Sequence, residues 1–155
     1  MASVFGKLNL KDQDEIVVLN APASFEPELA TLSDVRIKRS IGNVKAIAFS
    51  LAFVTQQKEV DAIARAVAKK TAGDAIVWFA YPKKSSKRYT SDLGMGTSGW
   101  APLGEVGFEP VRMIAIDEDW TAVRFRRAGF IKTLTRDSRA IMSKEGKAKA
   151  RRRAR

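Results

Sequence analysis

The chain has 155 residues, carries a net charge of +11 and contains neither histidine nor cysteine. A chain of this length fits a single domain with a sizeable hydrophobic core. The absence of cysteine and histidine excludes disulfides, thiolate and imidazole metal sites, cysteine nucleophiles and any serine–histidine relay.

The first half of the chain alternates apolar runs of strand length with helical segments. Residues 16–19 and 46–54 are continuous apolar runs that predict buried strands, and residues 35–38 alternate like an edge strand. Ser24 and Thr55 are predicted to cap the two helices that follow the buried strands. The second of these helices repeats its apolar side chains at helical spacing, so one of its faces is expected to pack on the sheet.

The rest of the chain contains the end of this helix and the remaining strands. Gly73 is predicted to stop the helix, and residues 75–81 form the most apolar of the predicted strands. A short helix is predicted over residues 100–106. Residues 111–116 and 121–125 are predicted strands separated by only four residues, and so short a link requires antiparallel pairing.

Buried strands interleaved with helices predict an α/β fold with helices on both faces of the sheet. The expected architecture is a single three-layer, Rossmann-like domain over residues 1–131. Its sheet is expected to be mostly parallel and to end in an antiparallel hairpin. Residues 132–155 have few large apolar side chains and are interpreted as a basic tail that is partly helical.

The net charge is concentrated at the C-terminal end. Residues 1–123 hold 15 basic and 15 acidic side chains, whereas residues 124–155 hold 13 basic and two acidic ones. This distribution predicts an electrically neutral body with a basic tail that contacts nucleic acid non-specifically, because clustered lysine and arginine bind phosphate backbones by releasing counterions. The alternative is a tail that only increases solubility. The densest basic residues are Lys147, Lys149, Arg151, Arg152, Arg153 and Arg155.

No targeting or membrane-spanning segment is recognisable in the sequence. The N-terminal residues lack the apolar core of a signal peptide. The longest uncharged apolar run, residues 46–54, is about half the length that a membrane-spanning helix needs. We therefore expect a cytoplasmic protein without a membrane partner.

Polar side chains follow the predicted strands at the sheet edge where ligands bind in open α/β folds. Lysine amines and serine hydroxyls suit a phosphate or carboxylate group, so this rim predicts a site for a small anion or for a protein partner. The alternative is that these loops are polar only because they are solvated. The candidate residues are Asn20, Tyr81, Lys83, Lys84, Ser85, Ser86, Asp117, Glu118 and Trp120.

Two acidic residues of the rim raise the question of a metal site. Asp117 and Asp119 would point to the same side of an extended backbone, and two carboxylates can hold Mg²⁺. Acidic residues are also common in hairpin turns, and Asp119 could instead pair with Lys83 or Lys84. No metal site is predicted.

Residues 94–99 match the dinucleotide-binding pattern G-x-G-x-x-G. That pattern should follow a buried strand directly and open a long helix. Here residues 88–93 are polar, and only a short segment remains before Gly107. The pattern is therefore not interpreted as a dinucleotide site.

Three strand-end segments resemble a family of small uncharacterised bacterial proteins with no established activity. They are residues 19–22, the Tyr-Pro-Lys-Lys-Ser-Ser motif at 81–86 and the Ile-Asp-Glu-Asp-Trp motif at 116–120. The resemblance covers roughly residues 5–127. It implies a fold similar to a reduced class I methyltransferase sheet, including the final antiparallel hairpin.

The resemblance also implies where a methyl-donor site would lie. A methyltransferase that binds S-adenosylmethionine would have a glycine-rich turn after its first strand and an acidic residue after its second. Residues 20–24 contain no glycine and residues 40–43 contain no acid. The sequence therefore favours a non-catalytic binding or regulatory domain without a cofactor. The alternative is a small enzyme or a nucleotide- or S-adenosylmethionine-binding protein that uses the rim.

Overall fold

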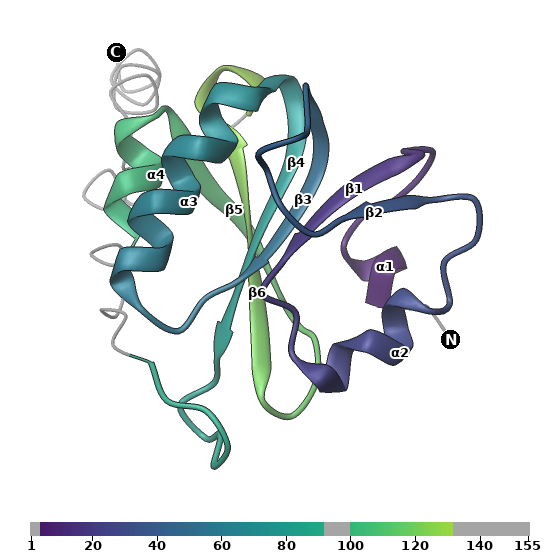
Figure 1. The fold of residues 1–155 in the computed structure, drawn as a ribbon. Coiled ribbons are helices and arrows are strands. Elements are labelled where there is room, and N and C mark those ends of the chain that lie inside the picture. The colour runs from purple at the N-terminus through teal and green to yellow at the C-terminus, as the bar shows by residue number, and fades with distance from the viewer. Residues whose placement is uncertain (1–3, 92–99, 132–155) are drawn as a thin grey trace.

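A six-stranded sheet forms the centre of the computed structural model, which describes residues 4–91 and 100–131 (Figure 1). The strands are β1 (Glu15–Leu19), β2 (Arg36–Lys38), β3 (Ile47–Phe53), β4 (Thr71–Pro82), β5 (Phe108–Ala115) and β6 (Trp120–Arg127). The helices are α1 (Val4–Lys7), α2 (Glu26–Leu29), α3 (Gln57–Lys70) and α4 (Ala101–Glu105), with the 3₁₀ turns η1 (Ala23–Phe25) and η3 (Ala128–Phe130). The glycine motif at 94–99 and the tail at 132–155 lie outside the described residues.

The strands lie in the order β2-β1-β3-β4-β6-β5. Strands β1 to β4 pair in parallel, and β6 pairs antiparallel with both β4 and β5. Only β6 of these strands therefore runs against the others. The predicted mostly parallel sheet with a C-terminal antiparallel hairpin is confirmed.

Helices cover the sheet on two sides, which gives three layers (Figure 1). On one side, Val17 and Phe79 pack with Val60 and Leu103 of α3 and α4. On the other side, the apolar cluster is built from α1, η1 and α2 together with the alternate strand residues. Its members include Phe5, Leu8, Phe25, Leu29, Ile16, Val18, Leu51 and Trp78. Alternation of side chains along each strand feeds both cores, which explains why the strand sequences are continuously apolar.

The two predicted helix caps were wrong, because each observed N-cap is the next residue along the chain. Gln56, not Thr55, is the N-cap of α3, and the side chain of Glu59 completes a capping box with it. Ser24 lies inside η1 and makes no capping hydrogen bond, because the chain already turns at Pro22. Among the described residues, no helix is long and apolar enough to cross a membrane.

Gly73 lies inside β4 and does not stop α3, so this prediction was also wrong. Thr71 leaves α3 in an extended conformation and enters the strand directly. Between the pairs Ile47–Thr71 and Phe49–Ile76, β4 contains extra residues that bulge out of the ladder. Gly73 supplies the left-handed conformation in this bulge, with φ of 61°.

The expectation of a neutral body was wrong by three charges. Arg124, Arg126 and Arg127 belong to β6 and therefore to the folded part of the chain. Residues 1–131 thus hold 18 basic and 15 acidic side chains, a net charge of +3, and residues 132–155 carry the remaining +8. The position after residue 123, where the charge of the sequence changes, lies inside β6. The domain boundary at residue 131 stays a prediction.

Candidate ligand site at the strand ends

The chain adds strands on one side of β1 first and on the other side afterwards, so the strand order changes direction between β1 and β3. After β1 the chain moves outward to β2, and it then crosses back over β1 to β3. In open α/β sheets the crevice at the carboxyl ends of such a strand pair is the usual ligand site. Here the corresponding place, which we call the switch point, is the region between Asn20 after β1 and the residues that link β3 to α3.

Asn20 joins the two sides of the switch point. It has a φ of 58°, a left-handed conformation that asparagine tolerates better than most residues other than glycine. Its Nδ2 donates hydrogen bonds to the carbonyl oxygen of Phe53, at 3.3 Å, and to Oε2 of Glu59, at 3.4 Å. Asn20 therefore makes the tight turn after β1 without a glycine, and its side chain links β1 to the segment between β3 and α3.

The carboxylate of Glu59 caps the N-terminal end of α3. Its Oε1 accepts hydrogen bonds from the backbone N–H of Thr55, at 2.9 Å, and of Gln56, at 3.0 Å. The hydroxyl of Thr55 lies 3.3 Å from the same oxygen. Helix N-termini often bind phosphate, but this one already holds an anion of its own chain. The switch point therefore favours a ligand that brings hydrogen-bond donors or positive charge.

Sequence reasoning named Asn20 but missed Glu59. The signal was present as Gln56-x-x-Glu59, a capping-box spacing with glutamine in place of serine or threonine. Nothing in that spacing indicates the contact with Asn20, which lies 39 residues away in the sequence. That contact depends on β1 and β3 being neighbours in the sheet.

A basic residue follows β2, at the position where a methyltransferase that binds S-adenosylmethionine would have an acidic residue. Arg39, directly after β2, donates two hydrogen bonds to the carboxylate of Glu26 on α2, at 2.6 and 2.9 Å. The hydrogen bond to Arg39 is the main cause of a lowered pKa of Glu26. The acidic residue beside the end of β2 is thus Glu26 of α2, and its carboxylate is already paired with Arg39.

The loop after β4 is tied to the β5–β6 hairpin. The backbone N–H of Lys83 donates to the carbonyl of Asp119, at 2.8 Å, and Ser86 Oγ donates to Oδ1 of Asp119, at 2.9 Å. Ser86 Oγ also accepts from the N–H of Tyr89, at 3.1 Å. Pairing of Asp119 with Lys83 or Lys84 was one alternative from the sequence, but the carboxylate accepts a hydrogen bond from Ser86. Ser86 and Asp119 therefore have a structural function in this loop.

Asp117 stabilises the hairpin turn. Its Oδ1 accepts hydrogen bonds from the N–H groups of Asp119, at 2.8 Å, and Trp120, at 2.9 Å. Within residues 4–91 and 100–131, no group of three or more acidic side chains is arranged to hold a metal ion. Lys84, Ser85 and Glu118 are exposed on the surrounding loops.

The two aromatic candidates of the rim lie in different cores. Tyr81 packs against Trp100 on the side of α3 and α4, and burial raises the pKa of its hydroxyl. Trp120 is 3% exposed and packs on the opposite side against Phe53 and Tyr89. Its indole N–H is buried and has no hydrogen-bond partner among the described residues.

The structure therefore brings the candidate residues into two groups along one sheet edge. Asn20 belongs to the switch point, whereas Lys83, Ser86, Asp117 and Trp120 belong to the hairpin group. Phe53 connects them, because its carbonyl accepts from Asn20 and its ring lies 5.1 Å from that of Trp120. We take the switch point as the candidate ligand site, since its polar side chains come from different elements and converge.

Comparison with solved structures defines the class of fold. A fibrillarin pre-rRNA processing protein of Methanococcus jannaschii is similar with a TM-score of 0.50 and 11% identity, over 76% of this chain and 67% of that one. The N-methyltransferase NodS of Bradyrhizobium japonicum, in complex with S-adenosyl-L-homocysteine, aligns with a TM-score of 0.46 and 9% identity, over 74% and 78% of the two chains. No protein-family model and no curated protein sequence matches this chain. The chain has a methyltransferase-like Rossmann fold.

Proposed function

We propose that this protein binds S-adenosylmethionine at the switch point, with Glu59 and Asn20 as its polar anchors. The observation that carries the proposal is the carboxylate of Glu59, which hydrogen bonds hold at the switch point, beside the carboxyl ends of β1 and β3. Ligands of open α/β sheets bind at this position. We therefore favour the alternative from the sequence analysis, a protein that binds S-adenosylmethionine, over a non-catalytic binding domain without a cofactor.

The negative charge of Glu59 at the switch point determines which adenosine-containing ligands we expect to bind. S-adenosylmethionine carries a sulfonium and an ammonium group, and both are attracted by a carboxylate. Nucleoside polyphosphates are strongly anionic, and the helix end that would receive their phosphates is occupied by Glu59. We therefore expect S-adenosylmethionine to bind more tightly than ATP.

Thermal denaturation with S-adenosylmethionine, S-adenosylhomocysteine or ATP tests this function. A ligand present at about 100 times its Kd stabilises a protein by about 2.7 kcal/mol. For a chain of this size, that corresponds to an increase in Tm of about 5–11 °C. Calorimetric titration then gives the Kd values. No stabilisation by S-adenosylmethionine at millimolar concentration would rule out the proposal.

Matched variants locate the site. Glu59→Gln keeps an oxygen that can accept the capping hydrogen bonds but removes the charge, and we expect it to weaken S-adenosylmethionine binding about tenfold, or about 1.4 kcal/mol. Glu105→Gln makes the same change at an exposed position on α4 and should leave the affinity unchanged. Equal losses in the two variants would argue against a site at the switch point.

A second proposed function is non-specific nucleic-acid binding by the tail, and its support is the charge of +8 on residues 132–155. If the tail neutralises about six phosphates, the logarithm of the affinity should fall against the logarithm of salt with a slope near −5. Glutamine at all six positions in the full chain should remove most of this slope. The positions are Lys147, Lys149, Arg151, Arg152, Arg153 and Arg155.

A further inference from the structure

Three arginines lie on one face of the β5–β6 hairpin, away from the switch point. Arg112 of β5 is directly opposite Arg124 of β6 in the strand register. Arg126 is two residues further along β6 and shares the face of Arg124, because side chains alternate along a strand. We call Arg112, Arg124 and Arg126 the arginine face.

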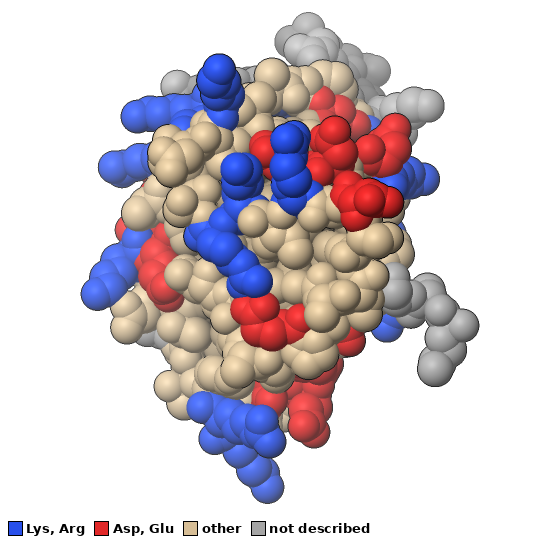
Figure 2. Space-filling view, turned by 45° about the vertical axis from the view of Figure 1, so that its right-hand side comes forward, with Lys and Arg blue, Asp and Glu red and all other residues tan. Residues whose placement is uncertain are grey.

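The arginine face begins where the apolar core ends. On β6, Trp120 and Ala122 belong to the apolar cluster under α1 and α2. The next residues on the same side of the strand are Arg124 and Arg126. On the face of the molecule that Figure 2 presents, basic and acidic side chains lie interspersed among uncharged ones.

Arg124 is incompletely hydrogen-bonded within the part of the chain that the structure describes. It is half-buried, and its Nε is buried without a hydrogen-bond partner among the described residues. Burial lowers the pKa of Arg124, and the charges of Arg126 and Arg112 lower it further, while Asp74 opposes them. Like charges directly opposite each other destabilise an antiparallel pair, so folding gives no reason for this arrangement.

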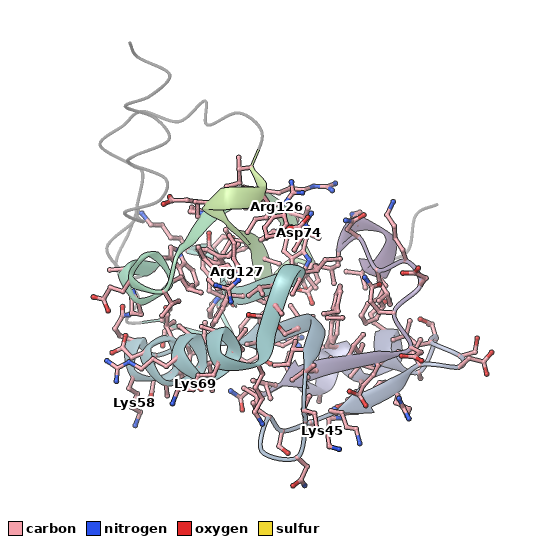
Figure 3. All side chains as sticks on the ribbon, turned by 90° about the horizontal axis from the view of Figure 1, so that it is seen from above. Lys45, Lys58, Lys69, Asp74, Arg126 and Arg127 are labelled. Atoms are coloured by element: carbon pink, nitrogen blue, oxygen red, sulfur yellow. The ribbon has the colours of Figure 1, made fainter. Side chains whose placement is uncertain are left out.

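Asp74 partly neutralises the arginine face. Its carboxylate accepts hydrogen bonds from Nε and Nη2 of Arg126, at 2.7 and 2.6 Å, and Figure 3 shows the two side chains next to each other. Arg112 is exposed, and no hydrogen bond or ion pair of its side chain is found within residues 4–91 and 100–131. Glu109 of β5 is opposite Arg126 in the strand register and is a second acidic residue on this side of the hairpin, so the three arginines outnumber the acidic residues beside them.

We propose that the arginine face binds phosphate groups of a nucleic-acid backbone. Guanidinium groups pair with phosphate oxygens through two parallel hydrogen bonds, and a bound phosphate would relieve the repulsion between Arg112 and Arg124. The choice of nucleic acid rests on the proposed function of the tail, because the sequence continues from β6 into residues 132–155 with their charge of +8.

Binding of the full chain to a fluorescent DNA duplex and to a single-stranded RNA, over a series of salt concentrations, tests the proposal. Arg112→Gln should weaken binding to all sequences alike and reduce the salt slope by about one. Asp74→Asn releases Arg126 and should have the opposite effect, tighter binding with a steeper slope. Arg65→Gln, an equal charge change on the exposed surface of α3, should leave the slope as in the wild type.

The outcomes separate the face from the tail. If Arg112→Gln still reduces affinity in the chain with six tail substitutions, the face binds independently and the proposal is supported. If both Arg112→Gln and Asp74→Asn bind like the wild type, the proposal is overturned, even where the tail substitutions abolish binding. Binding to anionic lipid vesicles but to neither nucleic acid would also overturn it. Arg112 is exposed, so an unchanged Tm should verify that its variant is folded.

Discussion

The parallel and the antiparallel parts of the sheet differ in their burial and in where their polar residues lie. Strands β1, β3 and β4 are parallel neighbours whose residues are buried from both sides, and the switch point lies at their carboxyl ends. The β5–β6 hairpin is antiparallel and places arginines on one face. Burial on both faces leaves function to the strand ends, whereas a strand pair with one open face can carry function along its length.

The largest expected effect is loss of a core side chain in the parallel part. Trp78 is fully buried, and its indole N–H donates to the carbonyl of Leu8 at 2.8 Å. Trp78→Ala should lower the free energy of unfolding by about 3–5 kcal/mol, measured by urea denaturation. Met113→Ala, at an exposed position on β5, should change it by less than about 0.5 kcal/mol. Similar losses at both positions would remove the contrast between the two parts.

A smaller effect is expected for the contact that fastens the hairpin to the parallel part. Arg127 donates to the carbonyls of Ala68 and Thr71 and to the hydroxyl of Thr71, and lies 4.7 Å from the ring centroid of Phe108. These acceptors are at the C-terminal end of α3, where a cation is favourable. Arg127→Ala should cost about 1–3 kcal/mol of unfolding free energy.

Arg127→Lys is the matched control for this contact. It keeps the positive charge but lacks the planar group that reaches several acceptors at once, so it should recover only part of the loss. Full recovery would mean that charge alone fastens β6 to α3. Denaturation curves of the three proteins decide between these results.

The capping box of α3 should contribute less again. Glu59→Ala leaves two N–H groups of residues 55 and 56 without their acceptor, and should cost about 1 kcal/mol. Glu59→Gln should cost less, because its amide oxygen can accept the same hydrogen bonds. If the two variants are equally destabilised, the charge of Glu59 stabilises α3 more than its hydrogen bonds do.

The smallest expected effect is the pH dependence of the ion pair beside β2. The pKa of Glu26 is lowered from 4.5 in the folded protein, mainly by its hydrogen bond with Arg39. Its contribution to stability is therefore present above pH 4.5 and is lost as the pH falls through the lowered value. Arg39→Gln should flatten this part of the pH–stability curve, and an unchanged curve would contradict the assignment.

Much of the fold could be predicted because few alternatives satisfy the sequence. The runs that became β3 and β4 are too apolar and too short for anything but buried strands. The four residues between the last two predicted strands left antiparallel pairing as their only arrangement. Helix caps were less predictable: Ser24, Thr55 and Gly73 are residue types that favour helix ends, but the actual ends depend on Pro22, Glu59 and the bulge in β4.

The fold class, the antiparallel hairpin and the total charge could be predicted, because they follow from local periodicity, link length and composition. Which polar residues meet depends on the tertiary fold. Asn20 contacts Glu59 because β1 and β3 are neighbours, and Arg112 faces Arg124 because of the strand register. Strand order and register depend on packing across the whole sheet, and no local pattern encodes them.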